Sequence, residues 1–277
     1  MKVGICGLGL IGGSMAKAYK AAGHTVYGFD KDNAALGYAI LSEICDGELN
    51  EERLMECELV FIALYPRAAI EYLKKIAPTL ENSETVVIDL CGTKTEICRV
   101  GFELAEKYSF TFVGGHPMAG TQYSGIKYSR ENLFKNAPMV LVPKVCDDIY
   151  FLEKIKNLLS PAMFGKITVT TAENHDALIA FTSQLAHIVS NAYVKSPTAQ
   201  NHKGFSAGSY KDLTRVAWLN ENMWSELFIE NKEPLLFEID SIISSLLEYR
   251  AAISDGDAEK LTSLLRDGRI AKEKVDG

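Results

Sequence analysis

The chain has 277 residues, of which 47% are hydrophobic, and its 29 basic and 36 acidic residues give a formal net charge of −7. A chain of this length and apolar content can bury a sizeable core in one large or two ordinary domains. No basic block is present that would neutralise a run of phosphates, so nucleic acid is not expected as a partner. No apolar stretch is long enough to cross a membrane, and residues 1 and 2 lead into a strand pattern, not a signal peptide. We therefore expect a cytoplasmic protein with no membrane partner.

The six cysteines and five histidines do not form a metal-site pattern. No two cysteines have the Cys-x-x-Cys spacing of zinc sites, and no two histidines have the helical spacing of a metal site. Reduced cysteine is commonly a buried residue. We therefore expect no metal cofactor.

Short β-rich runs alternate with helical segments through the first 165 residues. Residues 2–6 and 25–29 flank a helical pattern, which predicts a βαβ unit. Further strands are expected at residues 59–64, 85–88, 110–113 and 139–142. Strands that alternate with helices predict a largely parallel sheet with helices on both faces.

The sequence changes character after about residue 165, where helical periodicity dominates. One further strand-like run lies at residues 167–171, and a polar loop is expected at 196–210. Helices are expected at residues 172–195, 212–231, 234–254 and 257–274. The predicted fold is α/β. A Rossmann-type dinucleotide-binding domain occupies residues 1–165, and an all-helical domain for substrate binding and dimerisation occupies residues 166–277.

The expected helix at residues 234–254 carries a broad apolar stripe formed by Leu235, Ile239, Ile242, Leu246 and Tyr249. Such a broad stripe requires burial on more than one side. Core packing and a subunit interface both explain it, and two-fold dimers are the commonest soluble oligomers. We therefore expect a homodimer assembled through this domain.

A glycine motif, Gly7-Leu8-Gly9-Leu10-Ile11-Gly12, lies between the first expected strand and the first expected helix. This is the context that a dinucleotide-binding fingerprint requires. Gly7 permits the tight turn, Gly9 lets the backbone approach a pyrophosphate, and Gly12 allows the helix to pack closely on the strand. The start of the helix supplies free N–H donors for the phosphates.

Asp30 ends the second expected strand, where a carboxylate accepts hydrogen bonds from the ribose hydroxyls of NAD. It would repel a 2′-phosphate, so the sequence favours NAD over NADP. Two other interpretations stay open: Asp30 simply ends a strand, or Lys31 beside it softens the discrimination.

Three polar clusters outside the glycine motif are candidates for substrate chemistry. The first is His116, expected in a glycine-rich loop directly after a strand, at the edge of a parallel sheet where ligands bind. The second is the stripe of Asp176, Ser183 and His187 on the helix at residues 172–195, a pattern equally typical of a solvated face.

The third cluster is Arg215 with Trp224 nine residues later. Arginine is suited to a bidentate contact with a carboxylate, and an indole can form the wall of a pocket for a planar substrate. A helical arginine is also common on an ordinary surface, so this cluster alone does not define a site.

In this order behind the glycine motif, the clusters closely resemble the prephenate/arogenate dehydrogenase family. The resemblance spans nearly the whole chain. It rests on Gly7-x-Gly9-x-x-Gly12, Asp89-x-x-x-x-Lys94, His116-Pro117-Met118-Ala119-Gly120, His175-Asp176 with Ser183 and His187, and Asp212-x-Thr214-Arg215 with Trp224. The run that begins at His116 and the spacing between Arg215 and Trp224 are its most specific parts.

The resemblance implies an NAD-dependent enzyme of tyrosine biosynthesis that oxidatively decarboxylates prephenate, a small molecule, to 4-hydroxyphenylpyruvate. It implies that His116 is catalytic and assists removal of the proton from the ring hydroxyl as a hydride leaves the same carbon. Arg215 would bind a substrate carboxylate, His187 the pyruvyl side chain, and Trp224 would form a wall of the pocket. Further substrate contacts are implied for Thr93 and Ser183. The implied cofactor contacts come from Gly7, Leu8, Gly9, Leu10, Ile11, Gly12, Asp30 and Leu64.

The sequence departs from the family pattern at three positions. Many members have a serine where Gly92 stands, and that hydroxyl would contact the substrate and the catalytic histidine; Thr93 is the candidate to replace it. A histidine and a proline are common at the positions of Gln184 and Ala186. Because the side-chain pocket is atypical, arogenate remains an alternative substrate.

Two more distant functions compete with this interpretation. A β-hydroxyacid or 6-phosphogluconate-type dehydrogenase joins similar domains but uses a lysine on the first long helix of the second domain, and this chain has none between Lys166 and Lys195. A non-catalytic NAD-sensing protein would keep the glycine motif but need not keep His116, His187 and Arg215 together. Fold alone does not separate these functions.

Overall fold

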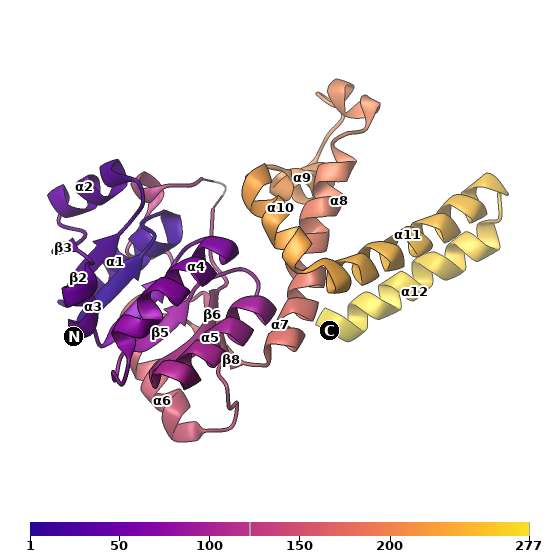
Figure 1. Ribbon diagram of the computed structural model, residues 1–277. Coiled ribbons are helices and arrows are strands. Elements are labelled where there is room, and N and C mark those ends of the chain that lie inside the picture. Colours follow the sequence, from indigo (N-terminus) through magenta and orange to yellow (C-terminus); the bar gives the residue numbers. More distant parts are fainter. Residues whose placement is uncertain (122, 277) are drawn as a thin grey trace.

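The computed structural model describes residues 1–121 and 123–276, which form a sheet-containing part and a helical part (Figure 1). The described strands form one eight-stranded sheet in the order β3-β2-β1-β4-β5-β6-β7-β8. Their bounds are β1 (Lys2–Cys6), β2 (Thr25–Phe29), β3 (Gly47–Glu48), β4 (Leu59–Ile62), β5 (Val86–Asp89), β6 (Thr111–Pro117), β7 (Pro138–Val142) and β8 (Lys166–Val169). Neighbouring strands are parallel except for β6 and β7, which are antiparallel. The predicted α/β fold with a largely parallel sheet is confirmed.

Helices cover both faces of the sheet because side chains alternate between the faces along each strand. Phe61 of β4 packs in the same core as Tyr19, whereas Val60 and Ile62 pack with Leu73 on the opposite side. The first face is covered by α1 (Leu10–Ala21) and α6 (Ile149–Leu158), and the second by α4 (Pro66–Ile76) and α5 (Thr95–Tyr108). Two shorter helices are α2 (Asn33–Leu41) and α3 (Glu51–Glu56).

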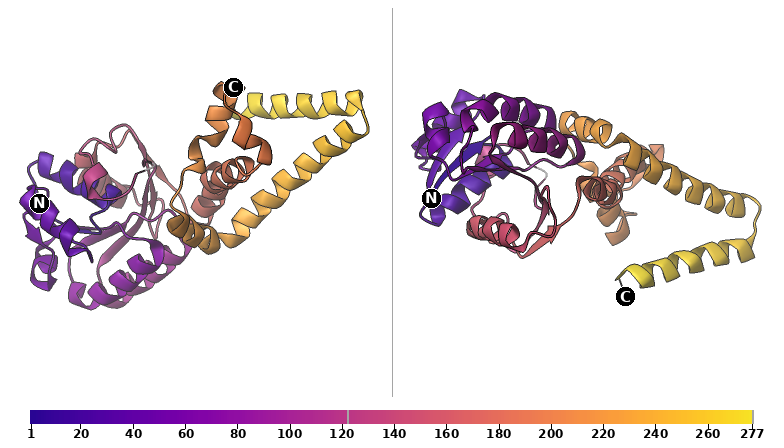
Figure 2. Two further views of the ribbon diagram at one scale, coloured as in Figure 1. Left: turned by 90° about the horizontal axis from the view of Figure 1, so that it is seen from above. Right: turned by 60° about the horizontal axis from the view of Figure 1, so that its bottom comes forward.

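The helical part begins with one long helix that contains a wider turn. It consists of α7 (Ala172–Ile179), a π-helical segment (Ala180–Leu185) and α8 (Ala186–Tyr193). The remaining helices are α9 (Gly208–Thr214), α10 (Glu221–Glu230), α11 (Lys232–Ser254) and α12 (Ala258–Asp276). Helices α11 and α12 form a hairpin that projects away from the rest of the molecule (Figures 1 and 2). Among the described residues, no helix has both the length and the apolar character needed to span a membrane.

His116 lies within β6, not in the glycine-rich loop expected from the sequence, and it pairs with Val140 of β7. The two glycines before it are packed rather than flexible. A Cβ atom on Gly114 would lie 2.4 Å from Cys98 Sγ, and one on Gly115 would lie 2.7 Å from the carbonyl oxygen of Asp89. The glycines therefore permit close contact with α5 and β5, and the strand continues past the expected end because Gly114–Pro117 pair with β7.

Two further predictions are wrong in detail, namely the helix at residues 212–231 and the loop at 196–210. The helix is interrupted: α9 ends at Thr214, a short 3-10 turn covers Arg215–Ala217, and α10 begins after Asn220, whose side chain accepts a hydrogen bond from Met223 N. The loop contains a 3-10 turn at Pro197–Asn201 and ends where α9 begins, at Gly208. Strand β3, only two residues long, has no recognisable pattern in the sequence.

Candidate active site

The glycine motif forms a tight turn between β1 and α1. Gly7 has a φ of +87°, and a Cβ atom on Gly12 would lie 1.8 Å from the carbonyl oxygen of Gly7, so neither position accepts a side chain without rearrangement. At Gly9, by contrast, an added Cβ atom would meet no atom within 4 Å. Gly9 precedes the first turn of α1, formed by Leu10, Ile11 and the residues after them, and no side chain caps this end of the helix. The turn therefore leaves open space in front of free N–H groups.

Asp30 lies beside this turn at the end of β2. Its carboxylate accepts hydrogen bonds from the backbone N–H of Leu8, at 2.7 Å, and from that of Asp32, at 2.9 Å. Leu64, which follows β4, borders the turn from the other side, because a Cβ atom on Gly7 would lie 2.8 Å from Leu64 Cδ2. Leu8, Asp30 and Leu64 are thus gathered around one open turn at the carboxyl ends of three parallel strands, where ligands bind in sheets of this kind.

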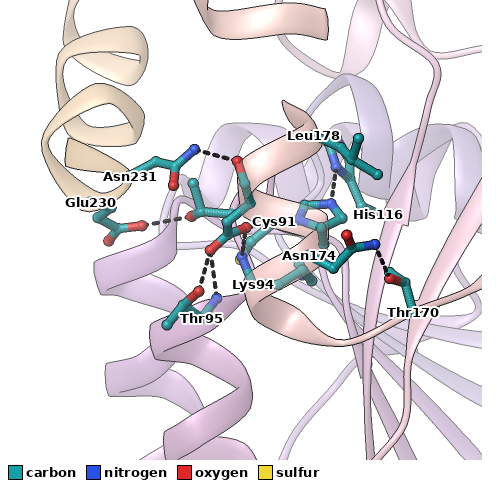
Figure 3. Close-up of polar contacts among 12 residues, drawn as sticks. Cys91, Lys94, Thr95, His116, Thr170, Asn174, Leu178, Glu230 and Asn231 are labelled. Carbon is teal, nitrogen blue, oxygen red and sulfur yellow. Dashed lines mark hydrogen bonds and ion pairs between the residues drawn. The ribbon is translucent and has the colours of Figure 1, made fainter. Parts of the chain in front are cut away.

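His116 is joined to Asp176 through a second histidine, His175. In Figure 3 a dashed line marks the contact of His116 with the neighbouring imidazole ring. The Nδ1 atom of His116 lies 2.9 Å from Nε2 of His175, and the Nδ1 atom of His175 lies 2.7 Å from Oδ1 of Asp176. His116 is partly exposed, whereas His175 and Asp176 are buried. The pair spans the molecule's two parts, since His116 belongs to β6 and His175 to α7.

The hydrogen-bond partners fix which ring nitrogens carry protons. Burial opposes ionisation of Asp176, but its hydrogen bonds from His175 and Thr95 hold its pKa below the usual value, so the carboxylate only accepts. Nδ1 of His175 therefore carries a proton, and in the neutral ring Nε2 accepts. His116 must then donate from Nδ1, which leaves its Nε2 atom unprotonated and able to take a proton.

A buried ion pair lies beside this chain of hydrogen bonds. The Nζ atom of Lys94 contacts the carboxylate of Asp89 and lies 2.7 Å from the carbonyl oxygen of Gly115, the residue before His116. Burial opposes the charge on Lys94, but Asp89 outweighs it and raises the pKa of the lysine. Burial, His175 and the Lys94 cation lower the pKa of His116 well below its usual value. His116 is therefore held as a neutral base.

Asp176 also binds the two parts of the molecule together. Its carboxylate accepts hydrogen bonds from the backbone N–H groups of Lys94 and Thr95 and from the Thr95 hydroxyl, at 2.6 to 2.8 Å, where α5 begins. A carboxylate is stabilised at the N-terminus of a helix by the helix dipole. On its other side, the amide of Asn231 donates to the Asp176 carbonyl oxygen and to Gln184 Oε1, at 2.8 and 2.7 Å. Every contact of this network is buried or partly buried, so the position of His175 is tightly determined.

Thr93 and Gly92 face α10 of the helical part. The Thr93 hydroxyl donates to Glu230 Oε2 at 2.7 Å. Burial raises the pKa of Glu230, although the hydrogen bond from Thr93 opposes this. A Cβ atom on Gly92 would lie 3.3 Å from Leu227 Cδ2, so Leu227 occupies the space beside it. Gly92 has no side chain and the Thr93 hydroxyl contacts Glu230, so neither takes the place of a serine beside His116, whose hydrogen-bond partner is His175.

The remaining predicted substrate residues line two neighbouring cavities of about 360 Å³ each. Ser183 and Arg215 line the first cavity, Trp224 lines the second, and His187 lines both. The rings of His187 and Trp224 are stacked, with their centroids 3.8 Å apart. His187 donates from Nδ1 to the carbonyl oxygen of Ser183 at 2.9 Å, and burial together with Arg215 lowers its pKa. His187 therefore presents an unprotonated Nε2 atom.

The structure thus places the predicted residues in separate groups: those around the glycine turn, His116 with His175, Thr93 with Glu230, and the four residues around the two cavities. Sequence reasoning quoted Asp89, Lys94 and His175 as parts of motifs without a role, and it placed Asp176 only on a polar stripe. It missed Gln184, Glu230 and Asn231 as contacts, and only the unusual glutamine at position 184 offered a signal. Among residues 1–121 and 123–276, no cluster of three or more His, Cys, Asp or Glu side chains could hold a metal ion.

Two family models together match most of the chain. The model described as "Prephenate dehydrogenase, nucleotide-binding domain" matches residues 15–167, and the one described as "Prephenate dehydrogenase, dimerization domain" matches residues 171–267. Prephenate dehydrogenase of Bacillus subtilis is 30% identical over 284 aligned residues, which cover 99% of this chain and 75% of the relative.

Two solved structures are similar over nearly their full length. The prephenate dehydrogenase of A. aeolicus in complex with hydroxyphenyl propionate and NAD+ is 28% identical, with a TM-score of 0.83, and the match covers 100% of this chain and 98% of that one. The arogenate dehydrogenase of Synechocystis is also 28% identical, with a TM-score of 0.81 and 99% of both chains covered.

The Rossmann-type sheet, the helical second part and the neutral histidine of β6 that contacts α7 define a two-domain dehydrogenase. The chain belongs to the prephenate dehydrogenase family, because the two family models and the relative at 30% identity cover both of its parts.

Proposed function

We propose that this protein is an NAD-dependent prephenate dehydrogenase, which converts prephenate to 4-hydroxyphenylpyruvate and carbon dioxide in tyrosine biosynthesis. The observation that carries this proposal is His116, a neutral histidine with a fixed tautomer and a free Nε2 atom. The family to which the chain belongs supports the same reaction. Arogenate, which differs from prephenate in having an amino group in place of a keto group, remains the second candidate, since a solved arogenate dehydrogenase is equally similar in sequence.

The glycine turn fits NAD. The space at Gly9 leaves room for a pyrophosphate against the uncapped start of α1, which favours anions. Asp30 is held at the end of β2 by Leu8 and Asp32, and each of its oxygens keeps a further lone pair for a ribose hydroxyl. NAD, when bound, accepts the hydride from the substrate. Gly7, Gly9, Gly12, Leu8, Leu10, Ile11, Asp30 and Leu64 are the residues that we propose for its site.

The task of His116 in this reaction is to hold a proton temporarily. Its Nε2 atom takes the proton of the ring hydroxyl while a hydride leaves the carbon that carries this hydroxyl. The bond to the ring carboxylate then breaks, carbon dioxide departs, and the electron pair of that bond makes the ring aromatic. The oxygen takes the proton back and becomes a phenol. The other residues of the site position the substrate and place charges around it.

The substrate side chain is proposed to bind at His187 and Arg215. Arg215 lines a cavity with Ser183 and His187, so its guanidinium is placed to bind a carboxylate there. The stacked ring of Trp224 supports His187 from the second cavity. Thr93, whose hydroxyl contacts Glu230, is the proposed contact from the nucleotide-binding part.

The helical part is proposed to form a homodimer. Apolar side chains of α11 such as Phe237, Leu246 and Ile253 are more than half exposed in the single chain, at 69%, 59% and 65%. The matched family model is described as a dimerization domain. We place the division between the two parts at residues 170 and 171, because β8 still pairs with β7 and α7 begins at Ala172.

The direct test is formation of NADH, measured at 340 nm, with prephenate and arogenate supplied separately. We expect turnover with prephenate, and a His116→Asn variant should lose a factor of about 10² to 10⁴ because asparagine cannot take the proton. Its affinity for NAD should stay close to that of the unmodified protein. Turnover with neither substrate, in a protein that binds NAD, would contradict the proposed function.

A further inference from the structure

We infer that the positive charge created when His116 takes the substrate proton does not stay on His116, because the Nδ1 proton of His116 passes to His175, where Asp176 stabilises the charge until the ring oxygen takes its proton back. This inference rests on the proposed function and adds to it a proton-storing role for His175. His175 does not touch the substrate in this scheme, so it is a positioning residue that acts through His116.

The geometry allows the transfer without any movement of heavy atoms. His116 donates from Nδ1 to Nε2 of His175 across 2.9 Å. When the substrate proton reaches Nε2 of His116, the Nδ1 proton can cross to His175. His116 is then neutral again, with its proton on the opposite nitrogen, and His175 is an imidazolium. That cation already has its counter-ion, because its Nδ1 atom lies 2.7 Å from the Asp176 carboxylate.

The surrounding charges favour this position for the proton. A cation on His116 would lie beside the Lys94 ammonium, which is hydrogen-bonded to the preceding carbonyl oxygen, whereas a cation on His175 lies beside the carboxylate of Asp176. Burial and the Lys94 cation lower the pKa of both histidines. At His175 the hydrogen bond to Asp176 and the charges of Asp176 and Asp89 oppose this, whereas at His116 only the charge of Asp176 opposes it. The charged groups that act on the pair are Asp89 of β5, Lys94 directly before α5 and Asp176 of α7.

The transfer leaves the overall reaction balanced. One proton enters the pair from the ring hydroxyl and one returns to the ring oxygen after the carbon–carbon bond breaks. The pair therefore ends in its starting tautomers and neither consumes nor releases a proton. The negative charge that develops on the substrate is matched during the reaction by a positive charge on His175, deeper in the protein.

A purely orienting role for His175 is the alternative, and nitrogen NMR distinguishes the two. The full chain is labelled with ¹⁵N-histidine, and its histidines are assigned by comparison with the His116→Asn and His175→Gln variants. As the pH falls, we expect His116 to exchange its Nδ1 proton for an Nε2 proton and stay neutral, while both nitrogens of His175 become protonated. An imidazolium at His116 with His175 still neutral would overturn the inference. This measurement needs no substrate.

Catalysis gives an independent test in mixtures of light and heavy water. For the unmodified protein, we expect a plot of the single-turnover rate of hydride transfer against the deuterium fraction to curve below a straight line, because two protons move. In His175→Gln, which keeps a hydrogen-bonding side chain but cannot store a proton, the rate should fall by about 10² and the plot should become straight. His24→Gln, which replaces a histidine at the start of β2, is the matched control and should change neither.

Binding of NAD and thermal unfolding show whether the His175→Gln protein is folded. A straight plot for the unmodified protein, or a folded His175→Gln enzyme with normal rate and a bowed plot, would overturn the relay. Failure of the proposed function is distinguishable: neither prephenate nor arogenate would then reduce NAD, while the NMR titration would still report where the proton resides.

Discussion

The Nζ atom of Lys94 lies 2.7 Å from the carbonyl oxygen of Gly115, the residue directly before His116. The side chains of Lys94 and its partner Asp89 are both fully buried. This ion pair therefore fixes the backbone of β6 where the base projects from it, and it also places a positive charge next to that base.

Removing only the lysine should destabilise the protein strongly. In Lys94→Met the Asp89 carboxylate would be left buried without its partner, and such a loss typically costs about 3 to 5 kcal/mol. The double variant Asp89→Asn/Lys94→Met has no stranded charge and should recover most of that free energy of unfolding. Urea unfolding of the three proteins checks this, and equal stability of Lys94→Met and the unmodified protein would contradict it.

The pH dependence of turnover should show the depressed pKa of the pair formed by His116 and His175. A proton added to the pair blocks Nε2 of His116, and the pKa of both histidines lies below the usual value of about 6.5, so kcat/KM should stay constant through that pH and fall only at lower pH. Removal of the Lys94 charge raises the pKa of the base. The fall should therefore move to higher pH in the Asp89→Asn/Lys94→Met variant, and an unmoved profile would show that this charge does not act on His116.

Asp30 should determine the choice of dinucleotide. Asp30→Ala loses the ribose contacts and also the hydrogen bond to Leu8 N, so the dissociation constant for NAD should rise much more than kcat changes. Asp30→Asn keeps an acceptor for Leu8 without the charge, and we expect it to lose less NAD affinity and to gain turnover with NADP. Titration calorimetry and rates with both cofactors measure this. Comparable kcat/KM with NADP in the unmodified protein would be the contrary result.

Arg215 should contribute to the binding of the substrate side chain. A charge-assisted hydrogen bond to a carboxylate is worth about 1.5 to 3 kcal/mol, so Arg215→Ala should raise KM for prephenate by roughly ten- to a hundredfold. Lys211→Ala, which removes another exposed cation about one turn earlier in the chain, is the matched control. If both variants keep the KM of the unmodified protein, Arg215 is a surface residue.

The protein should be a dimer of about 61 kDa, twice the 30.5 kDa of one chain. The reason is the exposed apolar surface of α11, which a second copy would bury. Replacement of Leu246 and Phe237 together by glutamate should yield a monomer, whereas Glu248→Asp, at a position of α11 that is already charged, should not. Light scattering at micromolar concentration measures both, and a 30.5 kDa particle for the unmodified protein would reject the dimer.

Local sequence patterns predicted the βαβ unit well because its signals are short-range. The signals for β1, for β2 and for the glycine turn after β1 each lie within a few residues of one another. Both strands have the predicted bounds. The same kind of reasoning misplaced His116, since glycines that permit close packing in a strand have the same sequence pattern as glycines in a loop. Asn220 interrupts the expected helix at residues 212–231 by capping a new one, and a polar residue within a helical pattern gives little notice of this.

The candidate site was only partly predictable because its central contacts are long-range. His116 and His175 are 59 positions apart and belong to different parts of the molecule, so no local pattern indicates that they touch. Asn231 is buried against Asp176 and Gln184, yet in the sequence it is an unremarkable polar residue between two helices. The motifs identified the right residue types, and only tertiary packing showed which of them share a hydrogen bond.

Asp176 joins the first turn of α5 to α7 while it also holds His175. The base and its partner therefore come from opposite sides of the division between the two parts. A nucleotide-binding half grafted onto a foreign helical half would still recognise its dinucleotide but would carry His116 without a histidine behind it. Recombination between relatives can thus exchange these halves productively only where the new helical half also supplies a histidine and an aspartate that match this junction.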